Sequence, residues 1–199
     1  EEFSVSSQEL SPTAISFSND GMKLFILGSS SDAIVTYNLV TAFDVSTSVY
    51  AGISEELSVT TQEIGPRGMA FNNDGKKIFI IGTENASVVE YSLTSAYKLS
   101  TATYEGVGEE FSVSAQETDP RGISFNNNGT KMFIIGASGD AVVEYSLASA
   151  YDVSTASYNG LAEEFSVASQ ETVPQDLVFN NDGTLMYVIG SVNDAIIQY

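Results

Sequence analysis

The chain contains no cysteine, no histidine and no tryptophan among its 199 residues. Without cysteine it has no disulfide, no thiol nucleophile and no thiolate-bound metal. Without histidine it lacks the usual general base, the Ser-His-Asp triad and most types of zinc site. The ten tyrosines are the residues that would replace tryptophan as a surface for stacking against sugars. Any catalysis would therefore depend on carboxylates or a bound metal.

Basic residues are also scarce. Seven Lys and Arg residues stand against 26 Asp and Glu, which gives a net charge of -19. This balance argues against nucleic acids and anionic membranes as partners, because both are bound through basic patches. It favours cations as binding partners, or it indicates only an acidic surface that is solvated by water. No apolar run is long enough for membrane insertion, and Glu1 to Phe3 already belong to a repeat, so a targeting segment is expected only outside this sequence.

What the chain does have is one pattern written four times with a period of 54 residues. The pattern keeps Glu, Phe and Gly in register, at Glu1, Glu55, Glu109 and Glu163, at Phe17, Phe71, Phe125 and Phe179, and at Gly21, Gly75, Gly129 and Gly183. A fixed period of this length indicates one supersecondary unit that is copied and stacked. We predict a single domain, 1–199, built from the repeats 1–54, 55–108, 109–162 and 163–199, with residues 1–10 completing the last repeat.

Each repeat has the alternating pattern of short strands. In the third copy the predicted strands are Gly122–Phe125, Lys131–Gly136, Ala141–Leu147 and Glu164–Val167. A tight turn at 126–129 separates the first two, since Asn and Gly tolerate the positive φ of hairpin turns. In the longer connection, 148–159, Asp, Ser and Thr favour local turns or a brief helical turn.

Four antiparallel strands per repeat with no helix predict an all-β fold, a β-propeller of four blades. The chain starts with an outer strand at Glu2–Val5 and ends on a blade that lacks one. We expect these ends to pair, Glu2–Val5 with Ala195–Tyr199, so that the ring closes without exposed strand edges. This arrangement favours a monomer. The alternative is a dimer in which each copy supplies half of an eight-blade ring.

Two stretches of the third repeat, Pro120–Phe125 and Asn127–Gly136, resemble the blade repeat of YVTN and lactonase-like β-propellers. The segments Pro66–Gly82 and Pro174–Gly190 match in the same way, with Asp-Gly in the turn. The blade here is longer, and its Asp-Gly turn precedes Phe or Tyr rather than the Trp of an Asp-box. The resemblance implies the fold and frequent use as extracytoplasmic binding or scaffolding modules. It transfers no catalytic residue.

A Gln-Glu pair precedes each predicted loop between blades: Gln8 and Glu9, Gln62 and Glu63, Gln116 and Glu117, Gln170 and Glu171. Symmetric carboxylates near the axis, with Glu63 and Glu117 as candidates, would bind a hard cation such as Ca²⁺ through oxygen. The alternative is that these side chains bond backbone amides at every blade joint.

The two arginines, Arg67 and Arg121, occupy equivalent positions at the start of the innermost strand, where the other blades have Thr13 and Gln175. Two neighbouring guanidinium groups would bind a carboxylate, for example that of an acidic sugar. The alternative is that each forms a salt bridge with Glu63 or Glu117.

Two further candidate sites lie on the face where propellers usually bind ligands and on the propeller axis. Asp32, Asp140 and Asp194 recur in variable hairpin turns, where they would ligate calcium or sugar hydroxyls, or else only shape the turn. Innermost-strand carbonyls near Ser16, Ala70, Ser124 and Val178 would form an axial cation site.

Symmetrically repeated acids, with neither His nor Cys, favour a non-catalytic binding or structural module over an enzyme. A glycan-binding propeller or part of a surface or virion appendage fits this interpretation, with a carbohydrate or protein partner, no required cofactor and an extracellular location. The alternative is a metal-assisted hydrolase or a lactonase-like enzyme with its site in the axial funnel.

Overall fold

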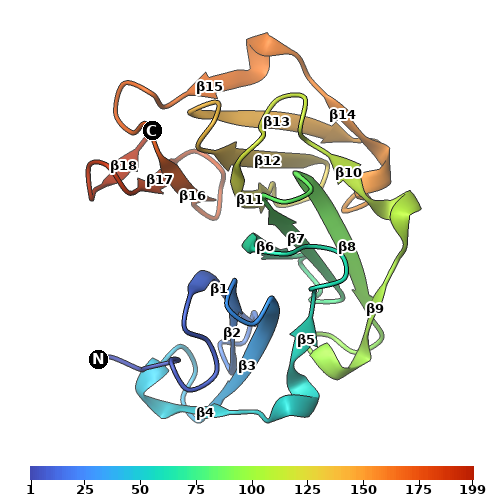
Figure 1. Ribbon diagram of the computed structural model, residues 1–199, viewed down its shortest axis with the longest axis vertical. Coiled ribbons are helices and arrows are strands. Elements are labelled where there is room, and N and C mark those ends of the chain that lie inside the picture. The colour runs from blue at the N-terminus through green and yellow to red at the C-terminus, as the bar shows by residue number, and fades with distance from the viewer.

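The computed structural model describes all 199 residues and shows four antiparallel sheets arranged side by side along an arc (Figure 1). The first sheet contains β1 (Pro12–Phe17), β2 (Lys23–Gly28), β3 (Ala33–Leu39), β4 (Ser48–Tyr50) and β5 (Leu57–Ser58). The second contains β6 (Pro66–Phe71), β7 (Lys77–Gly82), β8 (Ser87–Leu93), β9 (Ala102–Tyr104) and β10 (Phe111–Ser112). The third contains β11 (Pro120–Phe125), β12 (Lys131–Gly136), β13 (Ala141–Leu147), β14 (Ala156–Tyr158) and β15 (Glu164–Ser166). The fourth contains β16 (Pro174–Phe179), β17 (Met186–Gly190) and β18 (Ile196–Gln198).

Helix is limited to single 3₁₀ turns in the outer connections. They are η1 (Val45–Thr47), η2 (Ile53–Glu55), η3 (Leu99–Thr101), η4 (Val107–Glu109), η5 (Val153–Thr155) and η6 (Leu161–Glu163). The predicted all-β propeller of four blades is therefore confirmed. None of the helices is long and apolar enough to cross a membrane.

The predicted single outer strand is in fact two short ones. In the third blade β14 pairs with the end of β13, at Tyr145–Leu147, and β15 pairs with its beginning, at Ala141–Val143. The connection expected to be only turns thus contributes β14, next to the expected helical turn η5. The outer position is divided because β13 is seven residues long while each outer strand covers three of them.

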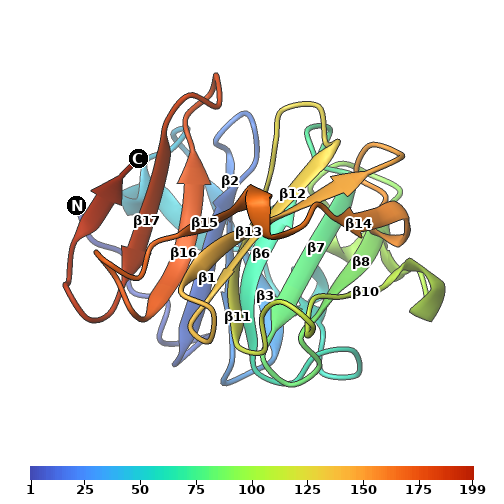
Figure 2. The ribbon, with the colours of Figure 1, turned by 90° about the horizontal axis from the view of Figure 1, so that it is seen from above.

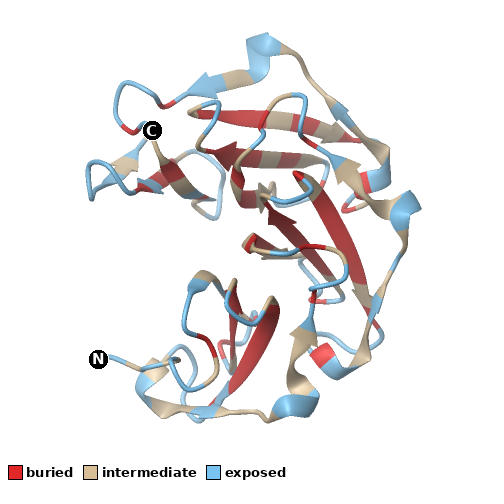
Figure 3. Ribbon diagram, viewed as in Figure 1, coloured by how far each residue is buried: buried red, intermediate tan, exposed pale blue.

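The core lies between successive sheets, which pack face to face in chain order (Figure 2). The middle strands are buried on both faces, and in β7 Ile78, Phe79, Ile80 and Ile81 are each 0% exposed. Figure 3 shows burial concentrated in the two middle strands of the first three blades and in β17 of the fourth, while β18 has no buried residue. Aromatic pairs cross each junction, such as Phe79 with Phe125 at a centroid distance of 4.5 Å.

The predicted closing pair between the chain ends is wrong. Residues 1–11 form no strand, β18 pairs only with β17, and the two ends lie on opposite sides of an opening in the arc (Figure 1). Phe3 and Val5 pack instead against the cluster of Leu24, Ile26, Val35, Tyr37 and Leu39 in the first blade. The segment thus covers apolar surface of its own blade and does not complete the last one.

Candidate functional site

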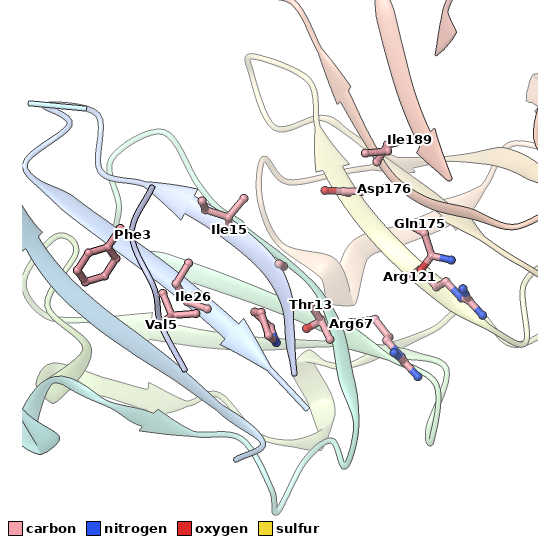
Figure 4. Close-up of a pocket in the computed structure, with 12 residues that line it drawn as sticks. Phe3, Val5, Thr13, Ile15, Ile26, Arg67, Arg121, Gln175, Asp176 and Ile189 are labelled. Carbon is pink, nitrogen blue, oxygen red and sulfur yellow. The ribbon is translucent and has the colours of Figure 1, made fainter. Parts of the chain in front are cut away.

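The four equivalent positions Thr13, Arg67, Arg121 and Gln175 are the extra residues of β-bulges. In each blade the register between the two inner strands shifts at this residue, as between Pro66 and Gly68 in the second blade. A bulge re-aims the side chain of its extra residue, and bulges are common beside functional sites. All four side chains line one cavity of about 530 Å³, where the innermost strands converge (Figure 4).

The rest of the cavity is formed by the first and last blades. Its apolar wall contains Phe3, Val5, Ile15 and Ile26 from the first blade and Ile189 from the last. Figure 4 shows Phe3, Val5, Ile15 and Ile26 gathered on the first blade, and Ile189 beside Asp176 on the last blade. The cavity therefore combines an apolar wall with a cationic and amide-bearing rim.

Asp176 is the one acid in this cavity, and it breaks the repeat. The equivalent positions hold Ala14, Gly68 and Gly122. Asp176 Oδ1 accepts a hydrogen bond from the backbone N–H of Leu177 at 2.9 Å. Asp176 is an exposed residue, but the protein atoms around its carboxyl partly desolvate it, which raises the pKa of Asp176 to about 6 despite that hydrogen bond.

The neighbouring blade leaves room for this carboxyl. A Cβ on Gly122 would lie 2.6 Å from Asp176 Oδ1, so only glycine fits there without displacing the acid. The two positions together form an arrangement that the other blade junctions lack.

The two arginines differ in their partners. Arg121 pairs with Asp119, with 2.8 Å between Nη2 and Oδ2, and its Nε donates to Oδ1 at 3.2 Å. The residue two positions before Arg67 is Gly65, whereas Asp119 lies two positions before Arg121. Arg67 therefore has no acid at this position, and it forms no ion pair. Its buried Nε has no hydrogen-bond partner. Arg67 is therefore the guanidinium left to bind an anion, and neither arginine forms the predicted salt bridge with Glu63 or Glu117.

The Gln-Glu pairs lie away from this cavity, inside the blade joints. Glu63 and Glu117 are each 1% exposed, and their carboxylates accept hydrogen bonds from backbone N–H groups of the next hairpin. Each paired glutamine accepts a hydrogen bond from a tyrosine hydroxyl, as Gln116 does from the buried Tyr145 at 3.2 Å. This geometry has the contacts that the blade-joint interpretation describes, and cation binding by these glutamates stays a prediction.

In the first blade this arrangement has a pH-dependent consequence. Burial acts to raise the pKa of Glu9, but hydrogen bonds from Ser30, Ser31 and Ser11 outweigh it and lower the pKa to about 2. A carboxyl with a lowered pKa stabilises the fold above its unfolded pKa, and that contribution is lost as pH falls. We expect wild-type stability to fall more steeply than that of Glu9→Gln between about pH 4.5 and 2. Urea unfolding of both proteins across this range measures the difference, and parallel curves would contradict it.

The aspartates of the hairpin turns occupy left-handed positions. Asp32, Asp140 and Asp194 have φ of 47°, 48° and 49°, and Ala86 takes the same conformation in the second blade. Asp32 Oδ1 accepts from the Gly65 N–H at 2.9 Å, which ties the turn to the next loop. Their placement agrees with the turn interpretation, and none of them lines the cavity.

The predicted axial carbonyl site lies three residues further along each innermost strand than the cavity rim. Ser16, Ala70, Ser124 and Val178 do not line the cavity, and no three acidic side chains gather as metal ligands. The axial cation therefore stays a prediction from backbone geometry alone.

Fold and cavity together define a β-propeller with an axial cavity, and its structural neighbours include lactonase-like propellers. One is a protein from Bacteroides uniformis provisionally named a 6-phosphogluconolactonase, with 15% identity and a TM-score of 0.62 over 94% of this chain and 52% of that chain. Another is the periplasmic gluconolactonase of Pseudomonas aeruginosa, with 15% identity and a TM-score of 0.55 over 92% and 48%. A third is hydrazine synthase of Kuenenia stuttgartiensis, with 18% identity and a TM-score of 0.59 over 94% and 45%.

Neither a protein-family profile nor a curated protein matches the sequence. The chain spans about half the length of the solved structures described above. At this level of identity the likeness establishes the fold.

The prediction that the chain is not an enzyme is wrong in the light of these neighbours. The similar structures include two proteins provisionally named 6-phosphogluconolactonases and a periplasmic gluconolactonase, so the propeller fold does not favour a non-enzyme. That prediction rested on the symmetry of the repeated acids. It overlooked Asp176, whose signal in the sequence is that it replaces a small residue at one repeat position.

Proposed function

We propose that the axial cavity is the active site of a hydrolase acting on small anionic sugar lactones. The observation that carries this proposal is the single unsymmetrical acid, Asp176, in a cavity that also holds the unpaired Arg67. Support comes from the neighbours named as lactonases. It also comes from the size of the cavity, about 530 Å³, which falls in the range typical of small-molecule sites.

In the proposed reaction ionised Asp176 takes a proton from a water molecule as that water attacks the lactone carbonyl. The ring C–O bond then breaks, the ring oxygen receives a proton, and the product is the hydroxy acid. Arg67 binds the anionic group of the substrate, since charge-assisted bonds from a guanidinium suit carboxylate and phosphate. Arg121 stays paired with Asp119 and adds positive potential at the rim.

The test is hydrolysis of 6-phosphoglucono-δ-lactone and of glucono-δ-lactone, each measured above its spontaneous rate. We expect Asp176→Asn to lower kcat/KM by about 10²- to 10⁴-fold, the usual contribution of a general base. Because the base must be ionised, wild-type kcat/KM should rise with pH through about 6, the pKa of Asp176, and then level off. Arg67→Gln should raise KM for the phosphorylated lactone by about tenfold or more, with a smaller effect on the neutral one.

Asp194→Asn is the matched control, because it changes an acid of the same blade that lies outside the cavity. Folding is checked separately. Asp176 has a raised pKa, so its contribution to stability is lost as pH rises from about 4 to 6, and Asp176→Asn should be at least as stable as wild type at pH 7. A wild-type rate equal to the spontaneous one, or full activity in Asp176→Asn, would refute the proposal.

A further inference from the structure

The outward face of the last blade is apolar and uncovered. Ile189 and Ile196 are 48% and 73% exposed, whereas the equivalent Ile135 and Val142 of the third blade are 0% and 4% exposed. Both isoleucines line a second cavity of about 180 Å³, which contains six hydrophobic residues among its seven. Apart from Asp176, which stands where the other blades have Ala14, Gly68 and Gly122, the face has the composition of an internal blade junction. It lacks the partner that the outward faces of the other three blades have.

The third blade shows what such a face packs against. Ile135 and Val142 are buried by Leu177, Met186 and Val188, which lie on the near face of the following blade. The first blade carries the equivalent residues Ile15, Leu24 and Ile26. Phe3 and Val5 already cover Leu24 and Ile26, which are 2% and 5% exposed. Ile15 is 60% exposed, although its equivalents Met69 and Ile123 are 7% and 4% exposed. The two faces beside the opening are therefore complementary halves of one junction.

The N-terminal segment, which has the sequence of an outer strand in other repeats, has no pairing partner beside this opening. Glu1–Val5 reads Glu-Glu-Phe-Ser-Val, the same as 109–113 and 163–167. In the third blade this segment forms β15, with Ala141 opposite Ser166 and Val142 opposite Phe165. The outer edge of β18 has no strand on it, and Glu1–Val5 has no strand partner.

Phe3 is nevertheless placed as its equivalents are. Its ring meets Tyr37 edge-on at 5.1 Å, as Phe111 meets Tyr145 at 5.2 Å. The segment is thus already held on the first blade, in position to add to the edge of a preceding blade.

The arc is also part of a larger circle. The four blades span an open arc (Figure 1), and nearly all of this chain aligns with about half the length of similar solved chains. The opening leaves room for further blades beside the first and the last.

We propose that two copies of this chain associate head to tail in one eight-blade ring. The first blade of each copy covers Ile189 and Ile196 of the other, and its residues 2–4 add to the edge of the other's β18. A twofold axis closes the ring, so both junctions are satisfied and no strand edge stays open. Ring closure places Ile15, Ile189 and Asp176 in or beside the junctions between copies, while Thr13, Arg67, Arg121 and Gln175 of both copies face one central channel. This inference concerns assembly, and its tests do not measure hydrolysis, so either proposal can fail without the other.

The first test is the mass of the 199-residue chain by light scattering, in about 0.3 M salt to screen its acidic surface. We expect a dimer of twice 21.2 kDa. Ile196→Glu should shift the mass to the monomer, because it places a charge in the buried junction. Ile53→Glu is the matched control, since Ile53 is 81% exposed on the outer turn η2 and should leave the dimer intact. A wild-type monomer throughout the micromolar range, or a dimer unaffected by Ile196→Glu, would overturn the proposal.

The second test uses the absence of cysteine. The β13–β15 register places Ser4 opposite Ala195 in the proposed pairing. Ser4→Cys protein mixed with Ala195→Cys protein should form a mixed disulfide under mild oxidation, because only a junction between copies brings the two together. Ser6→Cys mixed with Ala195→Cys is the control that lies out of register. Equal cross-linking in both mixtures, or none in the first, contradicts the proposed register.

Discussion

Replacing Glu117 by alanine is expected to lower the free energy of unfolding by about 3 kcal/mol. The Glu117 carboxylate accepts from the backbone N–H groups of Asp119, Ser138 and Gly139 at 2.7, 3.1 and 2.9 Å, and also from the Ser138 hydroxyl. Alanine leaves these partly buried donors without a protein acceptor, and a fully buried donor without an acceptor costs about 1–3 kcal/mol. The expected loss of stability is smaller than the sum of the separate donor costs because water reaches a loop more easily than a core. Urea unfolding at pH 7 measures the change.

Two variants separate this effect from the loss of a negative charge. Glu105→Ala removes an exposed acid from an outer connection and should change stability by less than about 0.5 kcal/mol. Glu117→Gln keeps one oxygen acceptor and should fall between the two. If Glu117→Ala proves as stable as Glu105→Ala, the carboxylate does not hold the blade joint.

The second large effect is expected for Gly129→Ala, a loss of about 3 kcal/mol. Gly129 has φ of +69°, which L side chains rarely adopt, and an added Cβ would overlap the ring of Tyr151. That ring packs against Phe125 and Phe79 at centroid distances of 5.4 and 6.3 Å, so it has little freedom to move. Both the backbone strain and the overlap therefore add to the cost.

The repeat supplies a control for this substitution. Gly183 has φ of +70°, but no atom lies within 4 Å of its added Cβ. Gly183→Ala should therefore cost only the backbone strain, about 1 kcal/mol. The difference between the two variants, measured by urea unfolding, is the contribution of the aromatic contact. Equal losses would mean that the ring of Tyr151 yields freely.

Most of one blade could be predicted from local patterns. Lys131–Gly136 and Ala141–Leu147 are strands with the predicted bounds, because their apolar alternation has only one stable arrangement in a stacked sheet. The outer strand was predicted less well, since a polar segment of two or three residues carries little periodic signal. Its division into β14 and β15 depends on which part of β13 each segment reaches.

The candidate site divides in the same way. Arg67 and Arg121 stand out in the sequence as the only arginines, and both do line the cavity. The sequence does not reveal that Asp119 neutralises one of them while Gly65 leaves the other unpaired. Glu63 and Glu117 are candidates for cation binding in the sequence, and in the structure their carboxylates accept hydrogen bonds from backbone N–H groups. Those donors come from hairpins about twenty residues away, and only folding brings them to the carboxylates.

By itself the sequence determined the repeat, the all-β propeller, the number of blades and the chemistry excluded by the missing histidine and cysteine. These properties follow from periodicity and composition, which need no coordinates. Tertiary structure alone decided the open arc, the bulges that turn Arg67 and Arg121 into one cavity, and the protein surroundings that raise the pKa of Asp176. The physical reason is that curvature, bulge direction and desolvation depend on how the blades pack against one another. The repeat pattern reveals the 54-residue period but not the angle at which its copies meet.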